Sequence, residues 1–274
     1  MKVHRVTICK QHHVASQRTW RLACVVAALT TAPVADAEDA SRWPYEMTAG
    51  KFRCHATFDL AGHQPLFREL AQLEQDVSHT LGIPHSDEPM HVYLFGNQLL
   101  YRQYLGQYFP AVPYRRALFV KNRGPGMVFA HLNQEFAVDL RHESTHAVLH
   151  SSLPMVPLWL DEGLAEYFEA PQAERASGNP HLNGVKWAVR FGRVPSLEQL
   201  EAKADLSEMD RGDYRNSWAW THFMLHGSRE AHDELVSYLA DIRASTPPGV
   251  LSERLRRRVP DMDRRFLDHF RNWR

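Results

Sequence analysis

The segment at residues 141–150 limits how this chain can fold more than any other, because it places two histidines four residues apart around a glutamate. It reads RHESTHAVLH and contains the pattern H-E-x-x-H. On an α-helix, residues four apart share a face and lie about 6 Å apart along the axis, so both imidazoles can reach one metal ion. The pattern predicts a helix with His142 and His146 as ligands of one Zn²⁺ per chain and Glu143 as the general base beside it.

A catalytic zinc ion needs a third protein ligand, and the chain offers two candidates for it. His150 lies two helical turns, about 12 Å, beyond the first histidine and cannot share the same ion. Glu162 stands in the segment 158–169 (LWLDEGLAEYFE), which predicts a second amphipathic helix. Pro154 and Pro157 end the first helix and let the chain reverse, so Glu162 can face the histidines. The alternative for Glu162 is an ordinary charged residue on the helix surface.

These two segments together resemble the gluzincin metallopeptidases, in which H-E-x-x-H is followed by a glutamate on a second helix. Residues 159–165 (WLDEGLA) are similar to the W-L-N-E-G-F-A segment of M1 aminopeptidases. The pairing of R-H-E-x-T-H with P-x-W-L-x-E-G-L-A-E-Y-F is most similar to a bacterial family of uncharacterised proteins labelled DUF1570. The resemblance implies a zincin-like fold, zinc bound by His142, His146 and Glu162, and Glu143 as general base.

Two further residues gain candidate roles from this resemblance. Residues 213–219 (DYRNSWA) resemble the P-Y-x-x-G-F-A stretch whose tyrosine stabilises the tetrahedral intermediate in M1 enzymes, so Tyr214 is the candidate oxyanion donor. Its alternative role is a core tyrosine. Glu166 matches the place where thermolysin-like enzymes carry an acidic partner for a zinc-ligating histidine. Its alternative role is a charge on the helix face.

The chain departs from M1 enzymes at the strand that should border the cleft. That strand carries G-A-M-E-N in M1 enzymes, whereas residues 126–131 read GMVFAH and lack the Glu-Asn pair that binds a free amino terminus. An aminopeptidase is therefore not implied. We expect this strand to have an exposed edge that can pair with an extended peptide.

The first 37 residues have the composition of a secretory signal peptide. Five basic residues precede the apolar run 22–29 (LACVVAAL), and Ala35-Asp36-Ala37 forms a small-residue cleavage site. The run is shorter than the roughly 20 residues of a membrane anchor. These features predict an exported protein, periplasmic or secreted, without a stable membrane anchor after cleavage. The alternative is a buried helix. Cleavage would leave Cys54 as the single cysteine, which we interpret as a small buried hydrophobic residue.

The remaining residues, 38–274, predict one α+β zincin-like domain in which a lobe with a small mixed sheet (38–133) precedes a helical lobe (134–274), with the H-E-x-x-H helix between them. Apolar spacing predicts strands at 52–58, 91–95, 117–120 and 127–132, the last two joined as a hairpin around the turn residues 122–126 (NRGPG). The same signals predict helices at 63–81, 97–108, 158–169, 214–225, 230–242 and 262–273, with Ser196 opening another. Trp218, Trp220, His222 and His226 are expected to pack inside, and the arginines at 254–258 to form a solvated helix face.

Composition narrows the class of function. The 32 basic and 32 acidic residues give a net charge of zero, which argues against a nucleic-acid partner. We found no glycine-rich phosphate loop and no nucleophile elbow. The sequence therefore predicts an exported zinc-dependent metallopeptidase that acts on a peptide or protein substrate. A non-catalytic envelope scaffold protein on the same fold is the alternative, and the oligomeric state stays open.

Overall fold

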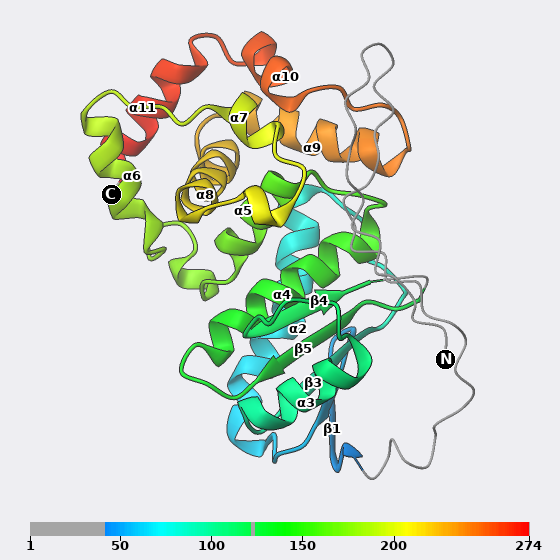
Figure 1. The fold of residues 1–274 in the computed structure, drawn as a ribbon. Coiled ribbons are helices and arrows are strands. Elements are labelled where there is room, and N and C mark those ends of the chain that lie inside the picture. Colours follow the sequence, from blue (N-terminus) through cyan, green and yellow to red (C-terminus); the bar gives the residue numbers. More distant parts are fainter. Residues whose placement is uncertain (1–41, 122–123, 274) are drawn as a thin grey trace. The chain divides into compact units, whose positions relative to one another are not determined.

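The computed structural model describes residues 42–121 and 124–273, which form two compact units. The predicted signal peptide lies outside these residues. The first unit comprises the described residues up to Gln75 and those within Ser86–Ser151, and the second comprises Asp76–His85 and the described residues from Ser152 onward. Figure 1 shows strands in the first unit and helices throughout the second. This confirms the predicted α+β class, with a mixed sheet and a helical part.

A five-stranded mixed sheet organises the first unit, in the order β1-β2-β3-β5-β4. The strands are β1 (Tyr45–Ala49), β2 (Phe52–Ala56), β3 (Met90–Phe95), β4 (Ala117–Val120) and β5 (Met127–His131). The pairs β1–β2 and β4–β5 are antiparallel, and the pairs β2–β3 and β3–β5 are parallel. Alternate residues of the central strands are fully buried, Cys54, Val92 and Val128 among them. Cys54 is therefore a core residue, as predicted.

Helices flank this sheet within the first unit. They are the 3-10 helix η1 (Ala61–His63), α2 (Gln64–Leu81), α3 (Gln98–Tyr108) and α4 (Phe136–Ser152). Asn97 caps α3, because its side chain accepts a hydrogen bond from the backbone N–H of Leu100. Tyr101 and Leu105 of α3 then pack with Trp43, Phe95 and Phe129 in one hydrophobic cluster. The last turns of α2, from Asp76, belong to the second unit.

The expectation of an exposed edge along residues 126–131 is wrong. Strand β5 pairs with β3 on one side and with β4 on the other, so its backbone groups are used in the ladder. The outer strand beside it is β4. The predicted hairpin of 117–120 with 127–132 is confirmed, and it places β4 on one side of β5 while β3 takes the other.

The second unit consists of helices gathered around α8. The α-helices are α5 (Leu158–Phe168), α6 (His181–Arg190), α7 (Leu197–Glu201), α8 (Arg211–His226), α9 (Arg229–Arg243), α10 (Leu251–Arg258) and α11 (Met262–Asn272), and the 3-10 helices are η2 (Gln172–Glu174) and η3 (Leu206–Glu208). Helix α8 contacts α5, α6, α7 and α9. Trp218 and Trp220 of α8 are buried, as predicted, with Phe266 and Phe270 of α11 among their ring neighbours.

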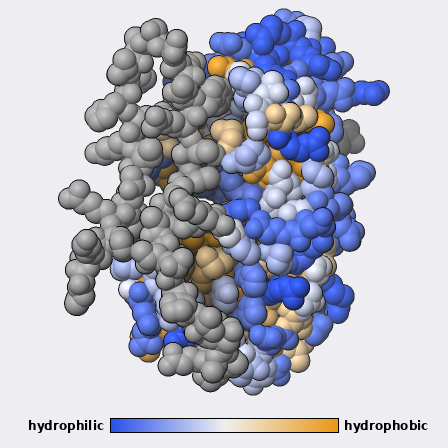
Figure 2. Space-filling model, turned by 90° about the vertical axis from the view of Figure 1, so that its right-hand side faces the viewer, coloured by the Kyte–Doolittle hydropathy of each residue, from blue (hydrophilic) through white to orange (hydrophobic). Residues whose placement is uncertain are grey.

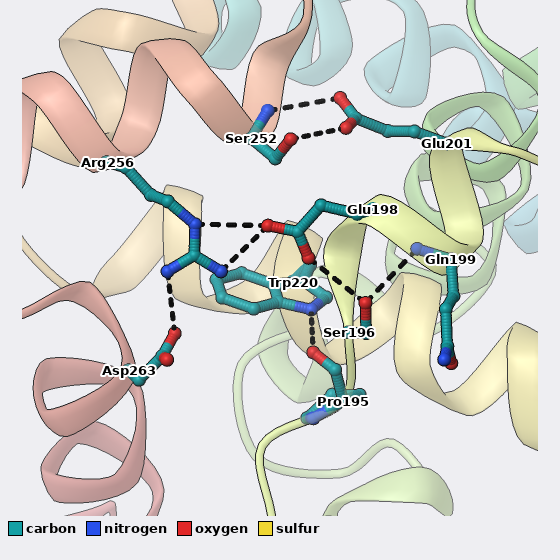
Figure 3. Close-up of polar contacts among 9 residues, drawn as sticks. All are labelled: Pro195, Ser196, Glu198, Gln199, Glu201, Trp220, Ser252, Arg256 and Asp263. Atoms are coloured by element: carbon teal, nitrogen blue, oxygen red, sulfur yellow. Dashed lines mark hydrogen bonds and ion pairs between the residues drawn. The ribbon is translucent and has the colours of Figure 1, made fainter.

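Arg256, Arg257 and Arg258 of α10 are exposed, as expected for a solvated helix face, whereas Arg254 is partly buried. Arg254 pairs with Glu234 and Asp241 of α9, and Arg256 pairs with Glu198 of α7 and Asp263 of α11 (Figure 3). The sequence predicts these arginines as one charged face of a helix. It does not show that acidic residues of α7, α9 and α11 lie beside that face.

Strand β1 and helix α6 were not predicted from the sequence.

The surface of the described residues is mostly polar. Figure 2 shows hydrophilic residues over most of the described part of the face it presents, with smaller apolar patches between them. Among the described residues, no helix combines the length and apolar character needed to cross a bilayer.

Helices α5 and α8 approach each other closely at Gly163. A β-carbon at this position would lie 2.5 Å from Oγ1 of Thr221 and 2.6 Å from the carbonyl oxygen of Ser217. Both distances are far inside van der Waals contact, and one of the partners is backbone. Only glycine allows this spacing of the two helices.

We predict that Gly163→Ala destabilises the protein by about 1 to 3 kcal/mol, because α5 and α8 must move apart to admit a methyl group. Urea unfolding measures the change. Gly106→Ala is the matched control, since Gly106 is also helical but has open space around its Cα. It should raise stability by about 0.5 to 1 kcal/mol through helix propensity alone. Equal effects of both substitutions would contradict the close contact.

Three histidines gather inside the second unit. His222 of α8 is 0% exposed, its Nδ1 lies 3.0 Å from Nε2 of His269, and its Nε2 donates to the carbonyl oxygen of Ala176 at 2.9 Å. His226 lies in the same cluster, with its ring 4.8 Å from that of His222, as the predicted packing role requires. Burial, together with the charge of His226, lowers the pKa of His222 to about 3 and that of His269 to about 4.

We predict that acid weakens folding through this cluster. Both histidines stay neutral in the folded protein, whereas in the unfolded chain they take up protons near pH 6.5. Stability is therefore full above pH 6.5 and falls by up to about 1.4 kcal/mol per pH unit for each histidine below it. Urea unfolding between pH 7 and 4.5 should show a shallower slope for the double variant His222→Gln/His269→Gln. A slope equal to that of the wild type would show that other groups cause the acid sensitivity.

Candidate metal centre

Helix α4 carries the H-E-x-x-H pattern and is fixed within the first unit by ion pairs. The guanidinium of buried Arg141 donates to Glu69 of α2 at 2.9 Å, and Asp139 accepts from Arg116 at 2.8 Å. Near the other end of the helix, Lys121 donates to the carbonyl oxygen of His150 at 2.8 Å. These contacts hold the helix at both ends, so the side chains between them keep a fixed orientation.

The two predicted histidine ligands lie side by side on α4, as their spacing requires. The ring centroids of His142 and His146 are 4.9 Å apart, with the planes at 76°. His146 is only 7% exposed and lies against the ring of Phe119, whereas His142 is partly exposed. The ring of His150 stacks on Phe119 at 5.6 Å, which gives this third histidine a packing role.

Glu143 lies within electrostatic reach of an aromatic cluster that the sequence did not reveal. Burial raises the pKa of the Tyr101 phenol, and the negative charges of Glu143, Tyr114 and Asp139 raise it further. The ring of Tyr101 is 5.1 Å from that of His131 at the end of β5. No local spacing in the sequence links these residues, because the pairing of β3 with β5 and the packing of α3 bring them together.

The tautomer of His131 follows from its neighbours. Its Nδ1 lies 3.0 Å from the carbonyl oxygen of Leu132, and a carbonyl can only accept, so Nδ1 carries the proton. Its Nε2 is then an acceptor 3.4 Å from the hydroxyl of Tyr114, which in turn accepts from Gln98. The first unit thus places a hydrogen-bonded polar array near the predicted general base.

Helix α5 carries the predicted third ligand in the second unit. It begins at Leu158 after Pro157, and five residues separate it from the end of α4. Glu162 is 4% exposed, next to buried Leu160 and Leu164 of the same helix. A carboxylate is buried at this depth only when a cation or strong hydrogen-bond donors compensate its lost hydration. The alternative interpretation of Glu162, an ordinary charged residue on the helix surface, therefore does not fit its burial.

Glu166 lies on α5 and Tyr214 on α8, the two helices predicted to carry them. Glu166 has a hydrogen-bond partner that the sequence did not predict. Glu166, one turn after Glu162, accepts a hydrogen bond from Nε2 of His181 at 3.0 Å. His181 opens α6, a helix absent from the sequence expectations. Tyr214 lies in the first turn of α8, which Asp210 and Asp213 start with a capping box. Tyr214 is partly buried.

Among the described residues, two sets of three side chains have donor atoms that could hold one metal ion. The first is His142, His146 and Glu162, and the second is His142, Glu166 and Glu169. In the first set two of the three residues are buried, and in the second all are partly exposed. The first set supplies two imidazole nitrogens and one carboxylate oxygen, which is a donor set suited to Zn²⁺.

A comparison with known protein families finds a match over the part of the chain that contains these residues. Residues 137–248 match the model of a family described as a protein of unknown function (DUF1570). No curated protein sequence matches the chain. The matched segment contains every residue predicted for the site, His142, Glu143, His146, Glu162, Glu166 and Tyr214. The chain is thus similar to DUF1570 proteins over the segment that would carry its chemistry.

Proposed function

We propose that this protein is a zinc-dependent metallopeptidase of the gluzincin type. The observation that carries the proposal is the combination of paired imidazoles on α4 with a buried glutamate on α5. Two neutral nitrogens and one carboxylate leave a bound Zn²⁺ with one net positive charge and an open fourth position, the arrangement that distinguishes catalytic from structural zinc.

The chemistry of these residues suits hydrolysis of an amide bond. A bound Zn²⁺ would lower the pKa of a water molecule and polarise a carbonyl group. The carboxylate of Glu143, beside the two ligands on α4, would accept a proton as the water oxygen attacks the carbonyl carbon. Glu143 would then deliver that proton to the leaving amine nitrogen as the C–N bond breaks, so atoms and charge balance over the cycle.

Two residues of the second unit, Tyr214 and Glu166, would assist this hydrolysis. The phenol of Tyr214 would donate a hydrogen bond to the developing oxyanion, a contribution typically worth several kcal/mol in such sites. Glu166 would orient a ligating histidine by accepting the proton of its second ring nitrogen. Its bond to His181 supports this role, because it already fixes the carboxylate in one orientation.

The substrate class follows from the reaction type. We propose a peptide or protein substrate that meets the chain in an extended conformation. Among the described residues, β4 is an outer strand of the sheet, and its free side could add such a strand. The proposed place of action is outside the cytoplasm, on the strength of the first 37 residues.

Two substitutions on α4 separate metal binding from catalysis. Glu143→Gln should keep near-stoichiometric zinc and lower the rate of peptide hydrolysis by about 10² to 10⁴, because the proton acceptor is lost. His142→Ala should lose both zinc and activity. Metal analysis and digestion of a proteome-derived peptide library measure the two outcomes.

His150→Ala is the matched control, since it removes a histidine from the same helix that lies too far along the axis to share the ion. It should keep both zinc and activity. Zinc retained in His142→Ala, or activity retained in Glu143→Gln, would contradict the proposal. A wild-type protein that binds zinc but cleaves no peptide in the library would favour a non-catalytic scaffold.

A further inference from the structure

Helix α6 exposes two large aromatic side chains that the fold does not use. Trp187 is 60% exposed and Phe191, directly after the helix, is 62% exposed. Their ring centroids lie 4.9 Å apart, as the four-residue spacing on one helix face requires. The opposite side of α6 holds it in the core of the second unit through Leu182, Val185 and Val189. The aromatic pair therefore lies mostly outside the core of the second unit.

Basic residues surround this pair, and acidic ones are absent from the segment. Between Glu174 and Glu198 the chain contains no Asp or Glu. The same stretch carries Lys186, Arg190 and Arg193 within four residues of the aromatic pair. In the part of the chain that the structure describes, none of these three cations has an ion-pair partner. This is a local excess of positive charge in a chain whose charges sum to zero.

The size of the patch decides between two kinds of partner. A stable protein interface buries about 800 Å² on each side. Two aromatic side chains, each offering at most about 150 to 250 Å² and already partly covered, fall well short of that area. A lipid bilayer, in contrast to a protein partner, can bind a small patch without a surface of complementary shape. Aromatic rings enter its interfacial layer, while flanking Lys and Arg contact anionic headgroups.

We propose that Trp187 and Phe191, with Lys186, Arg190 and Arg193, form a docking surface for an anionic lipid bilayer. Binding would be peripheral and reversible, because two side chains provide far less apolar area than a membrane-spanning helix. The surface shares no residue with the proposed metal centre, so the two proposals can fail independently.

Co-sedimentation of the full chain with vesicles tests this proposal. We expect binding to vesicles of phosphatidylglycerol and phosphatidylcholine at low salt, weak binding to pure phosphatidylcholine, and loss of binding as salt rises. Trp187→Ala/Phe191→Ala should lower the partition coefficient at least about tenfold. Arg190→Gln/Arg193→Gln should lower it about fivefold for each charge removed, and only on anionic vesicles.

Leu99→Ala on α3 is the matched control, because Leu99 is an equally exposed apolar residue of the first unit. All variants keep the same N-terminal residues, so differences between them report on the patch. Circular dichroism confirms that each variant is folded. Unchanged vesicle binding in the aromatic double variant would overturn the proposal. Absence of wild-type binding, with self-association that the same double variant abolishes, would identify a protein interface instead.

Discussion

The close contact of α5 with α8 at Gly163 is the constraint on which the helical unit depends. A side chain at this position would collide with the backbone of α8, so the glycine fixes how near the two helices lie. Glu162 is the preceding residue and is buried, so its position follows directly from that contact. Tyr214 belongs to the same α8. One glycine thus sets the distance between the helices that carry the proposed third ligand and the proposed oxyanion donor.

The sheet unit fixes the other half of the proposed chemistry by different means. Helix α4 is held by charge, through Arg141 with Glu69 and Asp139 with Arg116, rather than by a tight glycine contact. In each pair one partner is buried and the other is about half exposed, so the pairs specify orientation more than they add stability. This suits a helix whose task is to present His142 and His146 in a fixed direction.

Local patterns predicted most of the elements and the residues of the site. The fourfold spacing of His142 and His146 is a property of one helix and could be predicted from the sequence, as could the helix around Glu162. The hairpin of β4 with β5 could also be predicted, but the pairing of β5 with β3 could not, because strand order depends on contacts between distant segments. The partners of the α10 arginines and the array at Tyr101, Tyr114 and His131 also depend on distant segments. Glu166 was predicted, but its bond to His181 was not, because this contact joins α5 to a helix that was overlooked although Leu182, Val185 and Val189 have helical spacing.

The central claim is that His142, His146 and Glu162 bind one zinc ion with an open fourth position. X-ray absorption spectroscopy of the protein loaded with one equivalent of Zn²⁺ tests it most directly. We expect a four-coordinate spectrum with two imidazole nitrogens and two oxygen ligands at about 2.0 to 2.2 Å. We also expect Glu162→Gln to change the oxygen shell and to weaken zinc binding. A spectrum without imidazole scattering, or one identical in Glu162→Gln, would contradict the claim.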